Sequence, residues 1–309
     1  MIDFDYDDVD AALADSVLGL GVDRVPKLFA DGVVAHDADW WREVAALGVL
    51  GLATDPGGGA VTTIAAAMEA LGRCDAPGPF VETFVAMQLL PDDDVADGVA
   101  TGELLVTIAT SQPVPWLPIA DVVVAITDGR ATRATVSGVV ETLDSLAGEP
   151  WGRATLAPGA DLGDAHRALA IGDVAASAYL VGEAEHLLSE AAQYASDRIQ
   201  FGVPIASFQS VSHPLADCHL RLSAARALTR RAAHAIDHDT PDASTAAATA
   251  RRSATRAALD SAFRAHQTHG AMGFTVEGPI GNRSAKIRQV SLAASTGDTS
   301  DRVLAGWGL

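Results

Sequence analysis

Three short stretches near the end of the chain combine residue types that can bind a phosphate-bearing ligand. They are Arg198–Gly202, Phe208-Gln209 and Gln267–Phe274. A guanidinium such as that of Arg198 can form two parallel hydrogen bonds with a pyrophosphate. A glutamine amide can both donate to and accept from a ribose or an adenine edge, and glycine lets the backbone approach a ligand closely. Together, in this order, the three stretches predict one binding site for a ligand of this kind.

The chain lacks the motifs of several other chemistries. It has no G-x-S-x-G, no H-E-x-x-H, no Walker motif and no glycine-rich dinucleotide motif after a strand. His234 and His238 share one helical pattern, but no carboxylate or third ligand accompanies them. We therefore predict no metal site.

The predicted binding residues lie in a helical region. Between about 165 and 294, hydrophobic residues recur at helical spacing. Alanine is abundant in these patterns, which favours close packing of one helix on another. Three long helices are predicted: Ala168–Asp197, Val211–Asp237 and Ser244–Gly270.

The rest of the chain predicts a small β region preceded by further helices. The first hundred residues read as helical, with one helix over Val61–Leu71 that Gly72 ends. Between about 103 and 160, short β-rich runs occur with two turn signals, Asp128-Gly129 and Pro158-Gly159. This order of elements predicts a mainly α protein with a small β-domain.

Composition and charge limit the possible partners. The chain has 309 residues, of which 49% are hydrophobic and 20% charged, so it can form a substantial core. Its formal net charge of -19 argues against nucleic acid or an anionic membrane as a partner, because few cations would neutralise the phosphates. No apolar run approaches the ~20 residues of a membrane span, and the acidic start lacks a signal-peptide pattern. We expect a cytoplasmic protein.

Motifs of one protein family lie along nearly the whole chain. In the first part, Trp41–Leu52 is similar to W-x-x-L-A-x-L-G-x-x-G-L. Glu69–Arg73 is similar to E-E-L-G-R, and Ala76–Phe80 to A-x-P-G-P-F.

The same family's motifs continue in the last third. Tyr194–Gly202 followed by Phe208-Gln209 is similar to Y-x-x-x-R-x-Q-F-G and F-Q. Leu215–Asp217 is similar to L-A-D-M, and Gln267–Phe274 to Q-x-H-G-G-x-G-F. On these motifs, the chain resembles the acyl-CoA dehydrogenase family.

This resemblance implies a fold and an activity. The implied fold has an N-terminal helical domain at 1–100, a middle β-domain at 101–163, which looks truncated here, and a C-terminal four-helix bundle at 164–309. Members of the family introduce a Cα–Cβ double bond into acyl-CoA thioesters. A glutamate removes the α-proton while the N5 atom of FAD takes the β-hydride.

The resemblance also implies a set of cofactor-binding residues. In the family, residues at these motif positions contact the pyrophosphate and adenosine half of the FAD bound by the neighbouring subunit. Ala271 replaces the second glycine of the family's Gly-Gly pair. The implied FAD-binding residues are Arg198, Phe201, Gln209, Gln267, Gly270 and Ala271.

Other family features are missing. The chain has no T-E-x-x-A-G-S-D and no N-G-x-K-x-x-I-T, the segments that normally hold the flavin ring and part of the thioester. No glutamate stands at either of the family's base positions; Asp298 and Asp173 are the nearby carboxylates. Aspartate is one methylene shorter, which matters for a base that must reach its proton. We assign no catalytic residue and interpret Asp298 as a turn residue.

These features favour one hypothesis and leave two open. The chain is similar to the non-catalytic subunit of heteromeric (α2β2) acyl-CoA dehydrogenases of actinobacterial steroid catabolism. A homologous catalytic subunit would then be its partner, FAD would be shared across their interface, and an acyl-CoA would be the substrate. The alternatives are a homomeric dehydrogenase with Asp298 or Asp173 as base, and a non-enzymatic descendant that binds an acyl-CoA or a protein.

Overall fold

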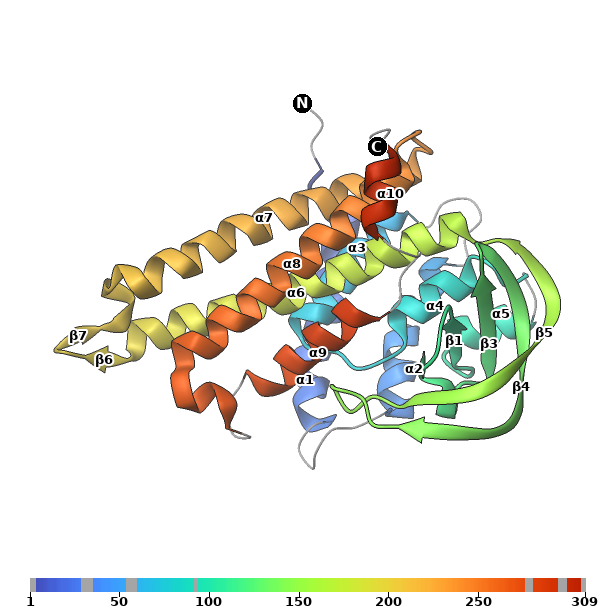
Figure 1. The fold of residues 1–309 in the computed structure, drawn as a ribbon, viewed down its shortest axis with the longest axis horizontal. Coiled ribbons are helices and arrows are strands. Elements are labelled where there is room, and N and C mark those ends of the chain that lie inside the picture. The colour runs from blue at the N-terminus through green and yellow to red at the C-terminus, as the bar shows by residue number, and fades with distance from the viewer. Residues whose placement is uncertain are drawn as a thin grey trace.

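The computed structural model describes residues 4–28, 36–53, 60–91, 94–275, 280–293 and 299–306. A long bundle of helices occupies one half of the molecule, and a twisted sheet with shorter helices occupies the other (Figure 1). Among the residues described, none of the helices is both long and apolar enough to cross a membrane. The mainly α fold with a small sheet confirms the predicted fold class.

The first hundred residues form helices around buried aromatic side chains. Asp37 caps one of them by accepting a hydrogen bond from the backbone N–H of Trp40 at 2.6 Å. The indole Nε1 of Trp40 donates to the carbonyl oxygen of Pro77 at 2.9 Å, which joins this helix to a distant turn. The helices are α1 (Asp8–Leu28), α2 (Ala38–Ala46), α3 (Val61–Arg73), α4 (Phe80–Met87) and α5 (Asp94–Ala100).

In the order of the sequence, the larger sheet follows these helices and precedes the long helices of the bundle. Its order is β1-β3-β4-β5-β2, with β1 parallel to β3 and the other pairs antiparallel. All of its strands fall between Val106 and Asp164, whereas the exact domain boundaries stay a prediction. The strands are β1 (Val106–Ala109), β2 (Val114–Pro115), β3 (Val122–Thr127), β4 (Arg130–Leu143) and β5 (Trp151–Asp164).

The two predicted turns have different outcomes. Asp128-Gly129 does connect β3 to β4, and both residues have positive φ angles of 49° and 75°. The turn predicted at Pro158-Gly159 is wrong, because both residues lie inside β5. The pairing with β4 shifts register there, and a Cβ on Gly159 would lie 2.3 Å from the carbonyl oxygen of Arg133. Proline and glycine here therefore accommodate an irregular pairing between β4 and β5, and they do not form a turn.

The last part of the chain contains the long helices that the sequence predicts. Their ends agree with the predicted ranges to within two residues. A small hairpin, β6 (Ile199–Gln200) with β7 (Val203–Pro204), joins the first of them to the second. The helices are α6 (His166–Asp197), α7 (Gln209–Asp237), α8 (Ala243–His269), α9 (Gly281–Leu292) and α10 (Thr299–Gly306).

Two glycines bring α3 and α6 into close contact. A Cβ on Gly72 would lie 2.0 Å from the carbonyl oxygen of Tyr179, and one on Gly182 would lie 2.1 Å from that of Glu69. The prediction that Gly72 ends the helix is wrong, because α3 continues to Arg73. The glycine is needed for the close helix crossing, not for a C-terminal cap.

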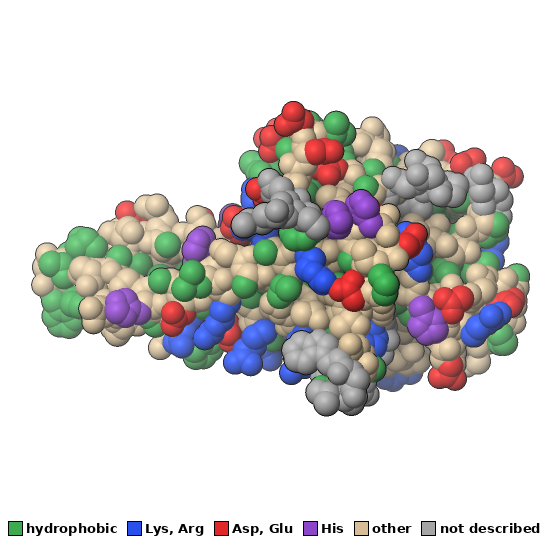
Figure 2. Space-filling view, turned by 90° about the horizontal axis from the view of Figure 1, so that it is seen from above, with side chains coloured by type: hydrophobic (Ala, Val, Ile, Leu, Met, Phe, Trp, Pro, Cys, Tyr) green, Lys and Arg blue, Asp and Glu red, His purple; other side chains and the backbone are tan. Residues whose placement is uncertain are grey.

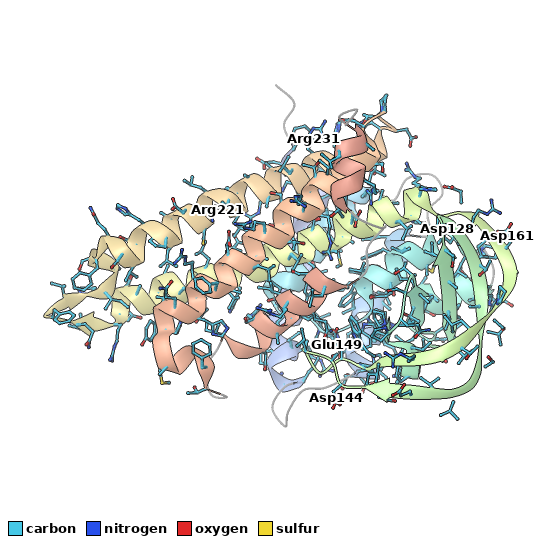
Figure 3. All side chains as sticks on the ribbon, in the orientation of Figure 1. Asp128, Asp144, Glu149, Asp161, Arg221 and Arg231 are labelled. Atoms are coloured by element: carbon cyan, nitrogen blue, oxygen red, sulfur yellow. The ribbon has the colours of Figure 1, made fainter. Side chains whose placement is uncertain are left out.

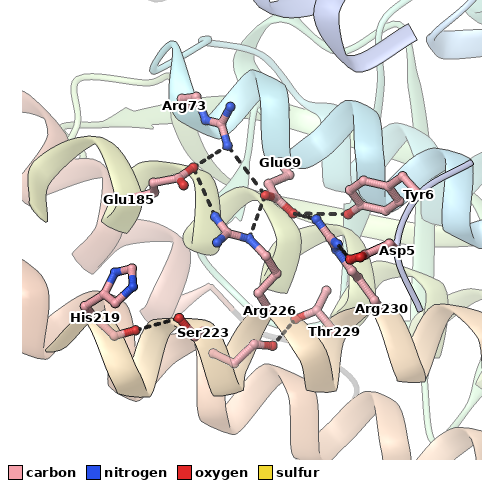
Figure 4. Close-up of polar contacts among 11 residues, drawn as sticks. Asp5, Tyr6, Glu69, Arg73, Glu185, His219, Ser223, Arg226, Thr229 and Arg230 are labelled. Carbon is pink, nitrogen blue, oxygen red and sulfur yellow. Dashed lines mark hydrogen bonds and ion pairs between the residues drawn. The ribbon is translucent and has the colours of Figure 1, made fainter. Parts of the chain in front are cut away.

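A buried carboxylate joins α3 to the bundle near this crossing (Figure 4). Glu69 is 6% exposed, and it accepts hydrogen bonds from Arg226 Nε at 2.8 Å and from the Tyr6 hydroxyl at 3.1 Å. Glu185 of α6 lies 3.0 Å from Arg226 Nη2, so the same guanidinium connects α3, α6 and α7. The arginines within 4 Å of Glu69 are Arg73, Arg226 and Arg230.

We expect Glu69→Gln to lower the free energy of unfolding by about 2 kcal/mol, because the buried side chain loses its negative charge beside three half-buried guanidinium groups. Urea unfolding of the full chain measures this change. Glu141→Gln is the matched control, since Glu141 and Arg153 form an exposed pair at 3.5 Å, and such pairs contribute only about 0.5 kcal/mol. Equal effects of the two substitutions would contradict a stabilising role for the Glu69 cluster.

Candidate functional site

Arg198 stands where α6 ends and the hairpin begins. Its backbone leaves the helix with φ -77° and ψ 112°, while its N–H still donates to the carbonyl oxygen of Tyr194 at 2.9 Å. Its carbonyl oxygen accepts from the Ile205 N–H at 2.8 Å, which closes the hairpin. The side chain is exposed, and within the described part of the chain no ion pair involves its guanidinium. The cation can therefore reach a ligand outside this chain.

Two further predicted residues lie on and beside the same hairpin. Phe201 is at its turn, with a positive φ of 53° and a side chain that is 94% exposed. Its ring meets the edge of Phe208 at a centroid distance of 6.1 Å. Gln209, the next residue, is exposed and begins α7.

The end of α8 supplies the remaining predicted residues. Gln267 is exposed, and its Oε1 accepts a hydrogen bond from Arg264 Nη1 at 2.7 Å. This contact engages the amide oxygen, and the amide nitrogen is the group that can donate to a ligand. Gly270 follows with φ 58° and ψ -133°, and no atom lies within 4 Å of where its Cβ would be. Together with the exposed Ala271, it gives a ligand open access to the backbone.

An aromatic contact holds the two groups of residues together. Tyr194 of α6 stacks on His269 of α8 at a ring distance of 4.3 Å. His269 is buried, and its Nδ1 lies 2.9 Å from the carbonyl oxygen of Ala265. The sequence alone indicated no role for either ring. The sequence signal that could have identified them is their position. Tyr194 lies one helical turn before Arg198, and His269 directly precedes Gly270.

This end of the bundle also exposes apolar side chains. Hydrophobic atoms gather at the tip that carries β6 and β7 (Figure 2). Single exposed apolar residues are normal, but a group at one tip marks a surface that another molecule can cover. The exposed residues at the ends of these elements are Ile199, Phe201, Val203, Phe263, Met272 and Phe274.

A cavity of about 230 Å³ lies at the other end of the bundle, between α4, α6, α9 and the sheet. Asp173 is on its wall and is 1% exposed; its Oδ2 accepts from Arg302 Nη1 of α10 at 2.7 Å. The structure thus places this base candidate in an ion pair that joins two helices. Asp298 lies outside the described residues.

A buried polar group that the sequence did not predict lies beside this cavity. Glu149, on the segment before β5 (Figure 3), accepts hydrogen bonds from Lys286 Nζ and Gln289 Nε2 of α9. Gln289 Oε1 in turn accepts from the Ala147 N–H at 2.9 Å. These contacts attach α9 to the segment that leads into β5. The one sequence signal was that Lys286 is among very few lysines in the chain.

The chain belongs to the acyl-CoA dehydrogenase family. A family model described as the acyl-CoA dehydrogenase C-terminal domain matches residues 162–295. The acyl-CoA dehydrogenase IpdE2 of Mycobacterium tuberculosis is 35% identical over 234 residues, which cover 71% of this chain and 69% of that protein. The short-chain specific acyl-CoA dehydrogenase of Megasphaera elsdenii is 36% identical over 121 residues, 38% of this chain and 31% of that protein.

Solved structures share the fold. The Tcur3481-Tcur3483 steroid ACAD G363A variant has a TM-score of 0.83 at 23% identity, and the match covers 97% of both chains. The ChsE4-ChsE5 complex from Mycobacterium tuberculosis has a TM-score of 0.83 at 21% identity, covering 98% of this chain and 97% of that one. The butyryl-CoA dehydrogenase of Megasphaera elsdenii has a TM-score of 0.82 at 18% identity over 99% of both chains.

If Asp173 is a structural partner of Arg302, Asp173→Asn should lower the free energy of unfolding by about 3 kcal/mol, because a buried ion pair loses one member. A double-mutant cycle with Arg302→Met, followed by chemical denaturation, measures the coupling between the two side chains. We expect the double variant to be less destabilised than the sum of the single ones. A stable Asp173→Asn protein that has lost dehydrogenase turnover would instead identify Asp173 as the base.

Proposed function

We propose that this chain is a non-catalytic subunit of a heteromeric, flavin-dependent acyl-CoA dehydrogenase. It completes the FAD site of a homologous catalytic subunit, and that subunit supplies the base. The observation that carries this proposal is the position of the predicted FAD-binding residues. Arg198, Gln267 and Gly270 lie together on an exposed tip, so they can form one wall of a site whose other walls belong to another chain.

The chemistry of this tip fits half of an FAD molecule. Arg198 offers a positive charge to pyrophosphate oxygens, while Gln209 and Gln267 offer amide groups to ribose or adenine. The open backbone at Gly270 allows close approach. When bound, FAD supplies the acceptor for the β-hydride. The residues of this chain would bind and orient its pyrophosphate and adenosine half.

The Tyr194–His269 stack supports this role by fixing the two helix ends relative to each other. A binding group is effective only if its geometry is maintained before the ligand arrives. Because His269 precedes Gly270 directly, and Tyr194 lies one turn before Arg198, the stack positions both parts of the wall. The Arg264–Gln267 hydrogen bond orients the amide in the same way.

Its similarities support a steroid-derived acyl-CoA as the substrate class. One structure with the same fold is described as a steroid ACAD, and another as the ChsE4-ChsE5 complex. We therefore propose that this chain assembles with a partner subunit and that the complex acts on a bulky acyl-CoA.

A self-sufficient homomeric dehydrogenase is the second candidate, because Asp173 does lie on the wall of a cavity. Its ion pair with Arg302 speaks against this reading. A general base must accept a proton from the substrate, and the positive charge of Arg302 stabilises the ionised carboxylate and so weakens it as a base.

We expect the lone chain to purify with little FAD and the complex with its partner to carry one FAD per heterodimer. Arg198→Ala should reduce FAD binding by the complex by about 1.5–3 kcal/mol, since a charge-assisted contact is lost. Flavin absorbance and equilibrium dialysis measure both effects. Arg221→Ala is the matched control: this exposed arginine of α7 pairs with Asp260 at 2.8 Å (Figure 3). A lone chain with near-stoichiometric FAD and full activity would refute the half-site proposal.

Light scattering should find a complex of about four chains that persists in high salt. The net charge of -19 opposes self-association, so assembly depends on apolar contact, which salt does not screen. We expect Phe201→Ser, at the exposed tip, to weaken the complex. Val139→Ser is the control, because Val139 is 90% exposed on β4, away from that tip. A well-behaved monomer of 31.8 kDa without any partner would count against the interface.

A further inference from the structure

The crossing of α3 and α6 contains a group of ionisable side chains that the proposed function does not use. Glu183 follows Gly182 directly on α6 and is completely buried, with 0% of its surface exposed. Its Oε2 accepts a hydrogen bond from Arg283 Nη1 of α9 at 2.8 Å. Its Oε1 is also buried, and no donor among the described residues forms a hydrogen bond with it. A buried acceptor in this state is costly, so it requires a partner.

The neighbour of this carboxyl group is Asp75, a half-buried residue in the turn after α3. The side chains of Asp75 and Glu183 are within hydrogen-bonding reach of each other. An ionised carboxylate can only accept hydrogen bonds, so two ionised carboxylates cannot pair. A carboxylic acid has one O–H donor, however, and it can donate this proton to a carboxylate. One proton would therefore give Glu183 Oε1 a partner and join the turn to α6.

The backbone at Asp75 shows that a carboxylate at this position is unfavourable. The residue has a positive φ of 58°, and the Ala76 N–H donates to the carbonyl oxygen of Leu71 at 3.0 Å. These are features of a helix C-terminal cap, in which glycine is the usual residue. The dipole of α3 also disfavours a negative charge at this end of the helix. A proton shared with Glu183 reduces this electrostatic cost.

The charges around the two carboxyl groups also favour one bound proton. Arg283 pairs with Glu183, and Lys286 of the same helix pairs with Glu149. The charge of Asp75 acts on both of these cations, but within the described part of the chain Asp75 has no ion pair of its own. Three carboxyl groups thus meet two cations, and one proton balances the group. In agreement, burial and then the charge of Asp75 raise the pKa of Glu183 well above its usual value, although Arg283 lowers it.

The remaining titratable groups that face the two carboxyls do not supply this positive charge. Arg73, at the end of α3, is paired with Glu185. Burial and two neighbouring arginines lower the pKa of His186 to about 4, so its imidazole is neutral at neutral pH. Burial raises the pKa of the Cys74 thiol to about 12 and that of the Tyr179 phenol well above its usual value, so both are uncharged as well.

We propose that Glu183 and Asp75 share one proton at neutral pH, and that this proton stabilises the α3–α6 crossing as a pH-sensitive switch. Loss of the proton at higher pH leaves two adjacent carboxylates, and their repulsion moves the turn after α3 away from α6. The carbonyl oxygen of Ala76 in that turn accepts from the Tyr179 hydroxyl of α6 at 3.0 Å, so this contact weakens too. Alkaline pH thus loosens the attachment of the N-terminal helices to the bundle. The switch does not depend on the proposed FAD half-site.

Urea unfolding of the full-length chain at a series of pH values tests the proposal. Glu183→Gln keeps the shape of the protonated acid and gives Asp75 a permanent N–H donor. A carboxyl whose pKa is raised by folding contributes stability at low pH, and this stability is lost as the pH rises. Between about pH 5 and pH 8, the unfolding equilibrium constant of the parent should therefore rise at least about tenfold more than that of Glu183→Gln. Glu190→Gln, at a half-buried glutamate of the same helix, is the matched control and should keep the pH profile of the parent.

A second variant keeps the test valid if Glu183→Gln does not fold. Asp75→Asn removes the other carboxyl group, and asparagine tolerates the positive φ of this turn. It should flatten the pH dependence in the same way. Infrared spectroscopy near neutral pH should show the carbonyl band of one protonated carboxyl group that is present in the parent and lost in both variants.

Hydrogen exchange, expressed as protection factors so that the intrinsic effect of pH cancels, locates the change. As the pH rises, the amides of residues 74–76 should lose protection in the parent but not in Glu183→Gln, while Ala257 in α8 stays protected in both. Parallel pH profiles of the parent and a folded variant would refute the shared proton, because a simple Glu183–Arg283 ion pair predicts a loss of stability that is constant with pH. Unchanged protection of residues 74–76 in the parent would refute the switch.

Discussion

The close crossing of α3 and α6 is the contact on which the rest of the structure depends. It exists because Gly72 and Gly182 each face a backbone oxygen at a distance that no side chain would permit. Side chains distant in the sequence form hydrogen bonds with backbone groups at both ends of α3. The Asp237 carboxylate of α7 accepts from the Val61 N–H at 2.6 Å, and Arg283 of α9 donates to the carbonyl oxygens of Gly72 and Arg73. Through these contacts, α3 attaches the N-terminal helices to the bundle.

This arrangement separates two chemical environments along the same helices. The start of α6 and the middle of α8 border the cavity, where buried ion pairs and aromatic rings enclose a small space. The ends of α6 and α8 form an exposed tip of the bundle (Figure 1). Because long packed helices are stiff, the distance between the two environments is a fixed property of the fold.

Much of the fold could be predicted from local patterns. The long helices followed from apolar periodicity, and alanine fills their contact, with Ala184, Ala191, Ala254 and Ala258 all buried between α6 and its neighbours. The errors came from glycine and proline. Gly72 and Pro158-Gly159 read as a helix end and a turn, but packing against another element determines their use. A pattern within a few residues carries no information about such a neighbour.

The sequence by itself determined the helix order, the family and the exposed residues proposed to contact a neighbour's FAD, because these depend on short motifs and regular spacing. Only the tertiary structure decided which charged groups meet. Glu69 with Arg226, Asp173 with Arg302 and Glu149 with Lys286 are each more than a hundred residues apart along the chain. It also decided that Arg251 would be buried, with one guanidinium nitrogen that has no hydrogen-bond partner among the described residues. Such contacts arise where helices cross, and no local spacing encodes that geometry.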